Sequence, residues 1–180
     1  MNYKNFWRLI FCIAICELAG GIGSIFTFPE IGAWYKALIK PGFNPPNWVF
    51  GPVWTALFFL LGISLYLVWN KNWKIKNKFG KDIKGWNPWS EKFWQGKWQK
   101  ENVILVFCLQ LFLNVLWSVL FFRMHLPGVA FFEILMLWFA ILYTIVNFYR
   151  VSKTSAYLLI PYILWVSFAA ILNLNIFLLN

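Results

Sequence analysis

The sequence predicts an all-α integral membrane protein built as a bundle of five transmembrane helices. Aromatic residues make up 22% of the chain and charged residues only 12%, whereas soluble domains carry about 25% charged residues. A hydrocarbon core roughly 30 Å thick needs about 20 apolar residues per helix. Five segments satisfy this length, at about residues 6–28, 47–69, 101–123, 127–149 and 155–178. They leave too little polar surface for a water-soluble globule, so residues 1–180 are predicted to form one membrane domain.

The first segment has two interpretations. Lys4 and Arg8 precede an apolar run, as they would in a secretory signal peptide. Glu17 interrupts that run, however, and a Gly-rich stretch follows in place of a small-x-small cleavage site. A retained helix is therefore the better interpretation. Small residues four apart, such as Gly20 and Ser24, let two helices approach closely, either at an internal packing seam or at a dimer face.

Lys and Arg are distributed unequally between the two sides of this five-helix arrangement. The side that holds the N-terminus and the segment 70–102 carries 13 basic residues, and the opposite side carries 3. Cytoplasmic loops are enriched in Lys and Arg. In a plasma membrane, the N-terminus and segment 70–102 are therefore predicted to be cytoplasmic, and the connection 29–46 is predicted to lie outside.

The connection 29–46 is predicted to form a stiff lid. Pro41, Pro45 and Pro46 cannot donate backbone hydrogen bonds, and each favours extended geometry in the residue before it. No charge separates Pro41 from the helix that begins near Asn47. The lid is therefore joined directly to a membrane helix.

The segment 70–100 is long, basic and rich in Trp. It holds most of the basic residues behind the net charge of +10. Trp and Lys together favour the headgroup layer, where the ring is half buried and the amine is wet. We therefore expect this segment to bind anionic lipid and not nucleic acid. The alternative is a loop that recruits a protein partner, which would make the chain an interaction or scaffold protein.

Ionisable residues inside membrane spans are candidate functional positions. Glu17 lies near the middle of the first helix and must be protonated, paired or turned toward a polar interior. Glu133 of the fourth helix is expected to contact Arg123 and His125, or a polar group on another helix. No ladder of further acids joins the two carboxylates, so an ion or proton pathway is the weakest functional hypothesis.

The sequence predicts no metal site and no firm catalytic residue. His125 is the sole histidine, and Cys12 and Cys16 lie one turn apart with no histidine nearby, so the cysteines are interpreted as packing residues. The chain contains no phosphate-binding loop, catalytic triad or dinucleotide-binding motif. We therefore expect no required cofactor.

Two polar stripes are predicted to face the interior of the bundle. Residues four apart share one face of a helix. The stripes are Gln110, Asn114 and Ser118 on the third helix, with Trp117 beside them, and Trp165, Ala169 and Asn173 on the fifth helix. Pro161 is expected to kink the fifth helix. Trp rings and a few amides beneath a lid are typical of a pocket for a flat, largely apolar ligand.

A series of motifs along all five helices resembles the TspO/MBR family of tryptophan-rich sensory proteins, which includes the mitochondrial translocator proteins. The motifs in the lid and the second helix are Trp34-Tyr35, Lys40-Pro41, Pro45-Pro46, Phe50-Gly51-Pro52-Val53-Trp54 and Tyr66. Those in the third and fifth helices are Gln110, Asn114, Trp117, Phe121-Phe122, Pro161-Tyr162, Trp165, Phe168-Ala169 and Leu172-Asn173.

The resemblance implies a five-helix bundle, usually a homodimer, with a ligand pocket beneath the first loop. Members bind porphyrins such as protoporphyrin IX and haem-related tetrapyrroles, and some bind cholesterol or benzodiazepine-type ligands. By motif, the ligand-binding residues would be Trp34, Tyr35, Pro45, Phe50, Trp54, Phe58, Asn114, Trp117, Ser118, Trp165, Ala169 and Leu172. Some bacterial members degrade protoporphyrin in light, and the two tryptophans implicated there match Trp54 and Trp165.

Two features depart from the family pattern. The segment 70–102 is much longer than the short connection expected in most relatives, so its role cannot be inherited from them. The sterol pattern of Leu or Val, then Tyr, then Lys or Arg is missing from the fifth helix, because no Tyr or basic residue follows Tyr162. The sequence thus predicts a membrane receptor, sensor or transporter for tetrapyrroles, with light-dependent porphyrin degradation as an alternative and sterol binding disfavoured.

Overall fold

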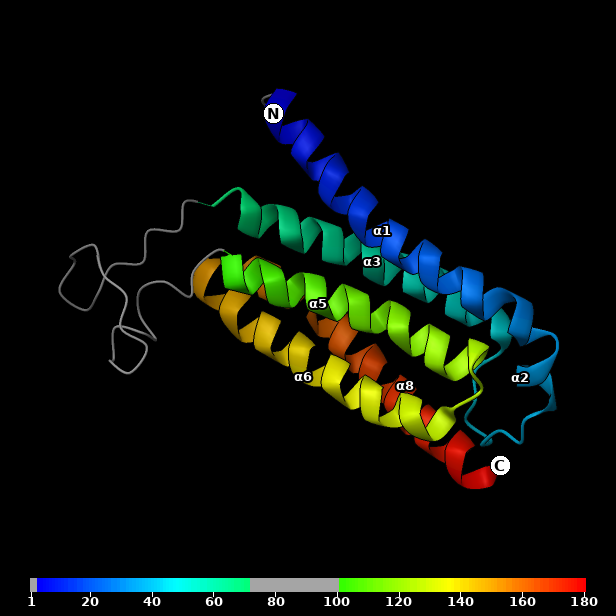
Figure 1. Cartoon of the computed structure of the whole chain (residues 1–180). Coiled ribbons are helices and arrows are strands. Elements are labelled where there is room, and N and C mark those ends of the chain that lie inside the picture. Colours follow the sequence, from blue (N-terminus) through cyan, green and yellow to red (C-terminus); the bar gives the residue numbers. More distant parts are fainter. Residues whose placement is uncertain (1–2, 72–100) are drawn as a thin grey trace.

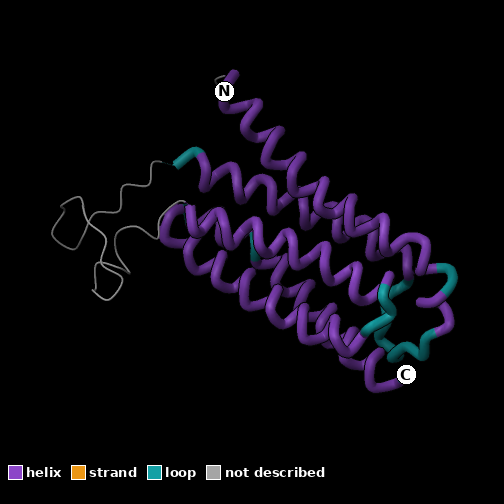
Figure 2. The backbone as a smooth tube through the Cα atoms, in the orientation of Figure 1, coloured by secondary structure: helices purple, strands orange, loops and turns teal. Residues whose placement is uncertain are grey.

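The computed structural model describes residues 3–71 and 101–180, and for residues 101–102 it describes the backbone alone. The predicted behaviour of the segment 70–100 therefore lies almost entirely outside the described residues. Within them, every regular element is helical, and five helical segments are long and apolar enough to cross a membrane. The predicted fold class, an all-α bundle of five transmembrane helices, is confirmed (Figures 1 and 2).

The first two spans are single helices joined by the lid. Helix α1 covers Tyr3–Ile31 and α3 covers Asn47–Trp69, while the short helix α2 covers Trp34–Ala37. The first helix thus continues past the predicted end at residue 28, through Pro29. Only two helical residues follow this proline, so the backbone bond that it cannot donate is lost at the very end of the helix. The connection, predicted as 29–46, is correspondingly shorter and partly helical.

Two of the remaining three spans contain an irregularity. The third is α5 (Glu101–Ser118) followed by a π-helical turn, η1 (Val119–Arg123), which the sequence did not predict. The fourth is the continuous helix α6 (Pro127–Val151). The fifth divides into α7 (Lys153–Leu158) and α8 (Ile160–Leu179), and the break falls two residues before Pro161. A proline lacks the N–H that an uninterrupted helix requires, which explains a distortion there.

Helices α5, α6 and α8 pack together, and α1 lies against α3 and α5 (Figure 1). Helix α1 is the least buried span, since only Cys12, Cys16 and Gly23 along its length are buried. Both cysteines belong to the main hydrophobic core and carry free thiols. The N-terminal part of α1 diverges from the other helices in Figure 1.

Two glycines set the crossing of α1 and α3. A Cβ atom on Gly62 would lie 2.5 Å from the Ile13 Cα atom, and a Cβ atom on Gly20 would lie 2.6 Å from the Phe58 ring. On the same side of α1, a Cβ atom on Gly23 would lie 3.2 Å from Ser118 Oγ. Gly20 and Gly23 therefore belong to an internal packing seam, one of the two roles expected for the small residues of this helix.

Candidate ligand cavity

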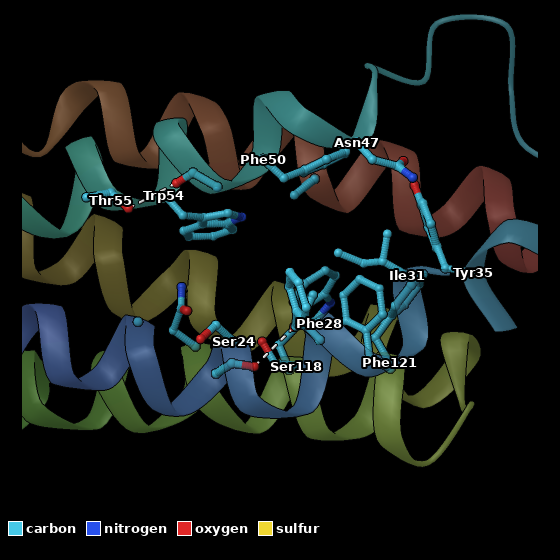
Figure 3. A pocket seen from close by; sticks show the side chains of 18 of the residues that line it. Ser24, Phe28, Ile31, Tyr35, Asn47, Phe50, Trp54, Thr55, Ser118 and Phe121 are labelled. Atoms are coloured by element: carbon cyan, nitrogen blue, oxygen red, sulfur yellow. Dashed lines mark hydrogen bonds between the residues drawn. The ribbon is translucent and has the colours of Figure 1, made fainter. Parts of the chain in front are cut away.

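A cavity of about 500 Å³ lies between α1, α3, α5 and α8, beneath the lid. We call it the lid cavity. Figure 3 shows the Trp54 ring extending from α3 into the space between α3 and α1. Ten of the twelve ligand-binding residues expected from the motifs border this cavity: Tyr35, Phe50, Trp54, Phe58, Asn114, Trp117, Ser118, Trp165, Ala169 and Leu172.

One wall of the lid cavity is a cluster of aromatic rings from α3 and α8. The Trp54 and Trp165 centroids lie 6.4 Å apart with the rings at 86°, and Phe50 meets Trp165 edge-on at 6.0 Å. Trp54 also stacks on Phe58 at 5.8 Å. Edge-to-face and offset contacts at these distances are the favourable geometries for aromatic pairs. The two tryptophans from separate spans therefore share one hollow.

A second aromatic wall comes from α5 and η1. Trp117 stacks on Phe121 at 5.1 Å, and its Nε1 atom donates a hydrogen bond to Asn173 Oδ1 at 3.0 Å. Asn173 Nδ2 in turn donates to the Pro127 carbonyl at 2.7 Å. The amide of Asn173 is thus occupied on both sides. It orients Trp117 and has little capacity left for a ligand.

A few polar groups on the wall keep free hydrogen-bonding capacity. Asn114 Nδ2 donates to the Tyr162 hydroxyl at 3.0 Å, which leaves its Oδ1 atom as an acceptor. Trp165 Nε1 is buried, and no described group accepts its hydrogen. Buried polar groups normally have a partner. A donor from α8 and an acceptor from α5 are therefore available to orient a bound molecule.

The lid cavity opens sideways between α1 and α3. Seven of its lining residues are exposed, and they form facing stripes on the two helices: Gly21, Ser24 and Phe28 on α1, and Asn47, Trp48, Gly51 and Thr55 on α3. Both stripes lie within membrane spans. The opening therefore faces the hydrocarbon part of the bilayer.

Several side-chain contacts hold the lid, residues 32–46. The Tyr35 hydroxyl donates to Asn44 Oδ1 at 2.7 Å. Burial raises the pKa of Tyr35 to about 12, partly offset by this hydrogen bond, so the phenol stays protonated at neutral pH. Lys40 Nζ lies 4.9 Å from the centroid of the Tyr35 ring. Asn180 pairs with both the N–H and the carbonyl of Ile39, each at 3.0 Å.

Trp34 and Pro45 do not border the lid cavity, unlike the other residues expected there. The Trp34 ring stacks on His125 at 4.4 Å, and His125 Nε2 lies 3.0 Å from Glu30 Oε2. Trp34 therefore packs the lid against the end of the third span. The Pro45 carbonyl accepts a hydrogen bond from Asn44 Nδ2 at 3.0 Å. It fixes the lid backbone and does not form part of the wall.

The expected contact of Glu133 with Arg123 and His125 is wrong. Both basic residues lie beside Glu30 at the end of α1, with Arg123 Nη1 4.0 Å from Glu30 Oε1. His125 adopts a positive φ of 56°, a turn conformation that reverses the chain between the third and fourth spans. The Glu133 side chain is buried, and its oxygens have no hydrogen-bond partner among the described residues. Glu17, by contrast, borders the lid cavity.

Sequence reasoning missed the wall that α1 contributes. Gly20, Gly21, Gly23, Ser24 and Thr27 all border the lid cavity. Their spacing was interpreted only as a packing motif, although small residues also leave space where the facing helix diverges. The exposed position of Ser24 opposite Thr55 of α3 was not visible from either segment alone.

Comparison with known proteins agrees with this architecture. A family model described as the TspO/MBR family matches residues 12–179. The chain is 40% identical over 179 residues to the tryptophan-rich protein TspO of Chlorobaculum tepidum, with 98% of each chain covered. It is 39% identical over 176 residues to the protein of the same name from Archaeoglobus fulgidus, covering 98% of this chain and 99% of that one. It is 35% identical over 153 residues to the translocator protein of Homo sapiens, covering 84% and 78% of the two chains. The chain therefore belongs to the TspO/MBR family.

Proposed function

We propose that this protein is a membrane receptor or sensor that binds protoporphyrin IX or a related tetrapyrrole in the lid cavity. Membership of the TspO/MBR family supports a receptor or sensor role in the membrane. The observation that carries the tetrapyrrole proposal is that Trp54 and Trp165, from different spans, border one hollow. A flat conjugated ring system can stack on one indole while its edge meets the other.

The size and polarity of the lid cavity support a ligand of this kind. A volume of about 500 Å³ lies within the range of about 300–1,000 Å³ typical of small-molecule sites. Glu17 is the only ionisable acid or base in the lining besides the Tyr35 phenol. The carboxylates of a porphyrin would therefore point away from the apolar wall, toward Lys40 in the lid. The sideways opening lets such a ligand enter from the bilayer.

Binding is tested by titrating protoporphyrin IX into the full-length protein in detergent and following the porphyrin absorbance band. Trp54→Ala should weaken binding about tenfold, because it removes a stacking partner and its buried area. The matched control is Trp7→Ala at the opposite end of the α1–α3 pair, which should bind like the wild type. Equal dissociation constants for the two variants, or no saturable change in the wild type, would refute the proposal.

Light-dependent degradation of bound protoporphyrin is the second candidate function. Trp54 and Trp165 lie close enough together to contact the same porphyrin, and indole rings can be oxidised by a photoexcited ligand. The double variant Trp54→Phe with Trp165→Phe keeps aromatic surface but removes both indoles. It should slow the loss of porphyrin absorbance under illumination. The control is Trp138→Phe, which should not slow this loss, because the Trp138 indole bonds Ser167 outside the cavity. Unchanged photodegradation in the double variant would remove this function and leave binding intact.

A further inference from the structure

A second hollow lies between the start of α1 and the end of α3. We call it the N-terminal crevice. Its volume is about 570 Å³, and its lining residues are Tyr3, Lys4, Trp7, Arg8, Phe11 and Trp69. Figure 1 shows why it exists, since the N-terminal part of α1 turns away from α3. None of its residues borders the lid cavity.

One side of the N-terminal crevice is an aromatic wall. Tyr3, Trp7 and Phe11 are four residues apart and so share one face of α1. The Tyr3 and Trp7 centroids lie 6.0 Å apart, and Phe11 meets Trp69 of α3 edge-on at 6.1 Å. About half or more of each α1 ring remains uncovered by protein, at 74%, 53% and 55% exposure along the stripe. The apolar part of a bound molecule can therefore pack along these rings.

Two cations lie beside this wall. Lys4 and Arg8 are four residues apart on the neighbouring stripe of α1. Arg8 Nη1 donates to Asn70 Oδ1 at 3.2 Å, and Asn70 Nδ2 donates to the Tyr66 hydroxyl at 3.2 Å. The bond to Asn70 ties the guanidinium to the end of α3 without neutralising it, because an amide carries no charge. Neither cation forms an ion pair within residues 3–71 and 101–180.

We propose that the N-terminal crevice binds an anionic phospholipid, with its phosphate on Lys4 and Arg8 and its apolar part along Trp7, Phe11 and Trp69. Trp, Lys and Arg at the ends of spans are characteristic of the bilayer interface, where lipid phosphates lie. Basic residues at this depth attract anionic lipids. Among the described residues the lining contains no carboxylate to bind the amine of a zwitterionic headgroup, so the preference is for a lipid with net negative charge.

The positive charge of Lys4 and Arg8 disfavours the two occupants that the protein itself could supply, which are a second copy and the segment 72–100. A second copy packed symmetrically on this face would bring Lys4 and Arg8 of both copies together. The segment 72–100 is itself basic, with eight Lys against one Asp and one Glu. Either occupant would add positive charge to two cations, which is unfavourable.

Brominated lipids test the proposal, because bromine quenches only nearby Trp fluorescence. The full-length protein is placed in vesicles of unlabelled phosphatidylcholine containing a minor fraction of brominated phosphatidylglycerol or brominated phosphatidylcholine. The difference between the wild type and Trp7→Phe isolates the contribution of Trp7 to quenching. We expect Trp7 to be quenched preferentially by phosphatidylglycerol, and excess inorganic phosphate should not abolish this preference, since the aromatic wall binds the lipid and not the free anion.

Charge variants show whether the crevice causes the preference. Lys4→Gln with Arg8→Gln should weaken the preference for phosphatidylglycerol about 30-fold, at about 1 kcal/mol for each lost charge. Lys4→Arg with Arg8→Lys should keep it. The matched control, Lys36→Gln with Lys40→Gln, removes two charges from the other end of the bundle and should also keep it. Equal quenching by both lipids, weak quenching by both as expected beneath a second copy, or a preference that survives Lys4→Gln with Arg8→Gln would each overturn the proposal.

Discussion

The two ends of the α1–α3 pair are hollow for the same geometric reason but differ in chemistry. Helices α1 and α3 approach closely near Gly62 and Gly20, because glycine has no side chain to keep its backbone away from the facing helix. Beyond this crossing they diverge in both directions. Toward the lid they frame the lid cavity, and toward the N-terminus they frame the N-terminal crevice.

The neighbours of the helix pair decide what each hollow can bind. Helices α5 and α8 and the lid close the lid cavity with additional walls, and its lining includes no basic residue. Within residues 3–71 and 101–180, the N-terminal crevice is bordered by α1 and α3, and it carries two cations. A hollow with several aromatic walls suits a flat apolar ligand, whereas an open cationic crevice suits a membrane lipid. One pair of helices thus frames two hollows of different chemistry.

The largest expected effect comes from breaking the crossing itself. Gly62→Leu would place a side chain against the Ile13 backbone, which cannot move aside as a flexible side chain could. We expect a loss of about 3 kcal/mol in stability, because overpacking a close helix contact forces the backbones apart. Thermal unfolding in detergent, followed by circular dichroism, measures it.

The matched control for this change is Gly21→Leu. A Cβ atom on Gly21 would meet nothing within 4 Å, although Gly21 lies on α1, the partner of α3 at the crossing, and borders the lid cavity. It should cost much less stability than Gly62→Leu. If both variants unfolded at the same temperature, the crossing at Gly62 would not be what holds α1 on α3.

The second-largest effect is expected from a substitution that fills the lid cavity and leaves the N-terminal crevice unchanged. Ala169 is buried on α8 and borders the lid cavity, so Ala169→Leu would occupy space that a ligand needs. We expect protoporphyrin binding to weaken about tenfold, or about 1.4 kcal/mol, while lipid quenching of Trp7 stays unchanged. Ala56→Leu adds the same atoms at an exposed position of α3 outside the lining and should leave both unchanged. A parallel loss of porphyrin and lipid binding would show that the two hollows are not independent.

The sequence was sufficient for the spans and for most of the lid cavity, because the rings that line it carry distinctive motifs. Trp54 and Trp165 were predicted to converge, and they border the same hollow. The sequence could not show that Trp34 stacks on His125, since that contact depends on the positive φ of His125. Lys4 and Arg8 were interpreted only as a possible signal-peptide feature and as part of the orientation count. Their role in a crevice depends on the angle between two helices, which no single segment encodes.

A smaller effect is expected from loosening the lid, which covers the lid cavity and not the N-terminal crevice. The Asn180 side chain bonds the N–H and carbonyl of Ile39 in the lid and the carbonyl of Ile176 in its own helix. Asn180→Ala should speed protoporphyrin dissociation several-fold, since each exposed hydrogen bond contributes about 1 kcal/mol or less. Stopped-flow absorbance measures the rate. Asn175→Ala also removes an exposed amide from α8, but one that bonds only Ile171, and an equal change in that variant would exclude a lid-specific role for Asn180.

The smallest effect concerns the hydrogen bond from Tyr35 to Asn44 inside the lid. Tyr35→Phe should cost about 1 kcal/mol of stability at neutral pH, but it should cost little when added to Asn44→Ala, because Asn44→Ala already removes the same bond together with the bond from Asn44 Nδ2 to the Pro45 carbonyl. The folded-state pKa of Tyr35, about 12, is above the ordinary value of 10. Its contribution is therefore fully present below pH 10 and is lost as the pH rises toward 12, since the unfolded phenol ionises first. Unfolding free energies measured from pH 7 to 11 should show the wild type approaching Tyr35→Phe only above pH 10. A gap that closed below pH 9 would mean that the Tyr35 phenol is not the titrating group, and that the lid is held at this point by something other than its bond to Asn44.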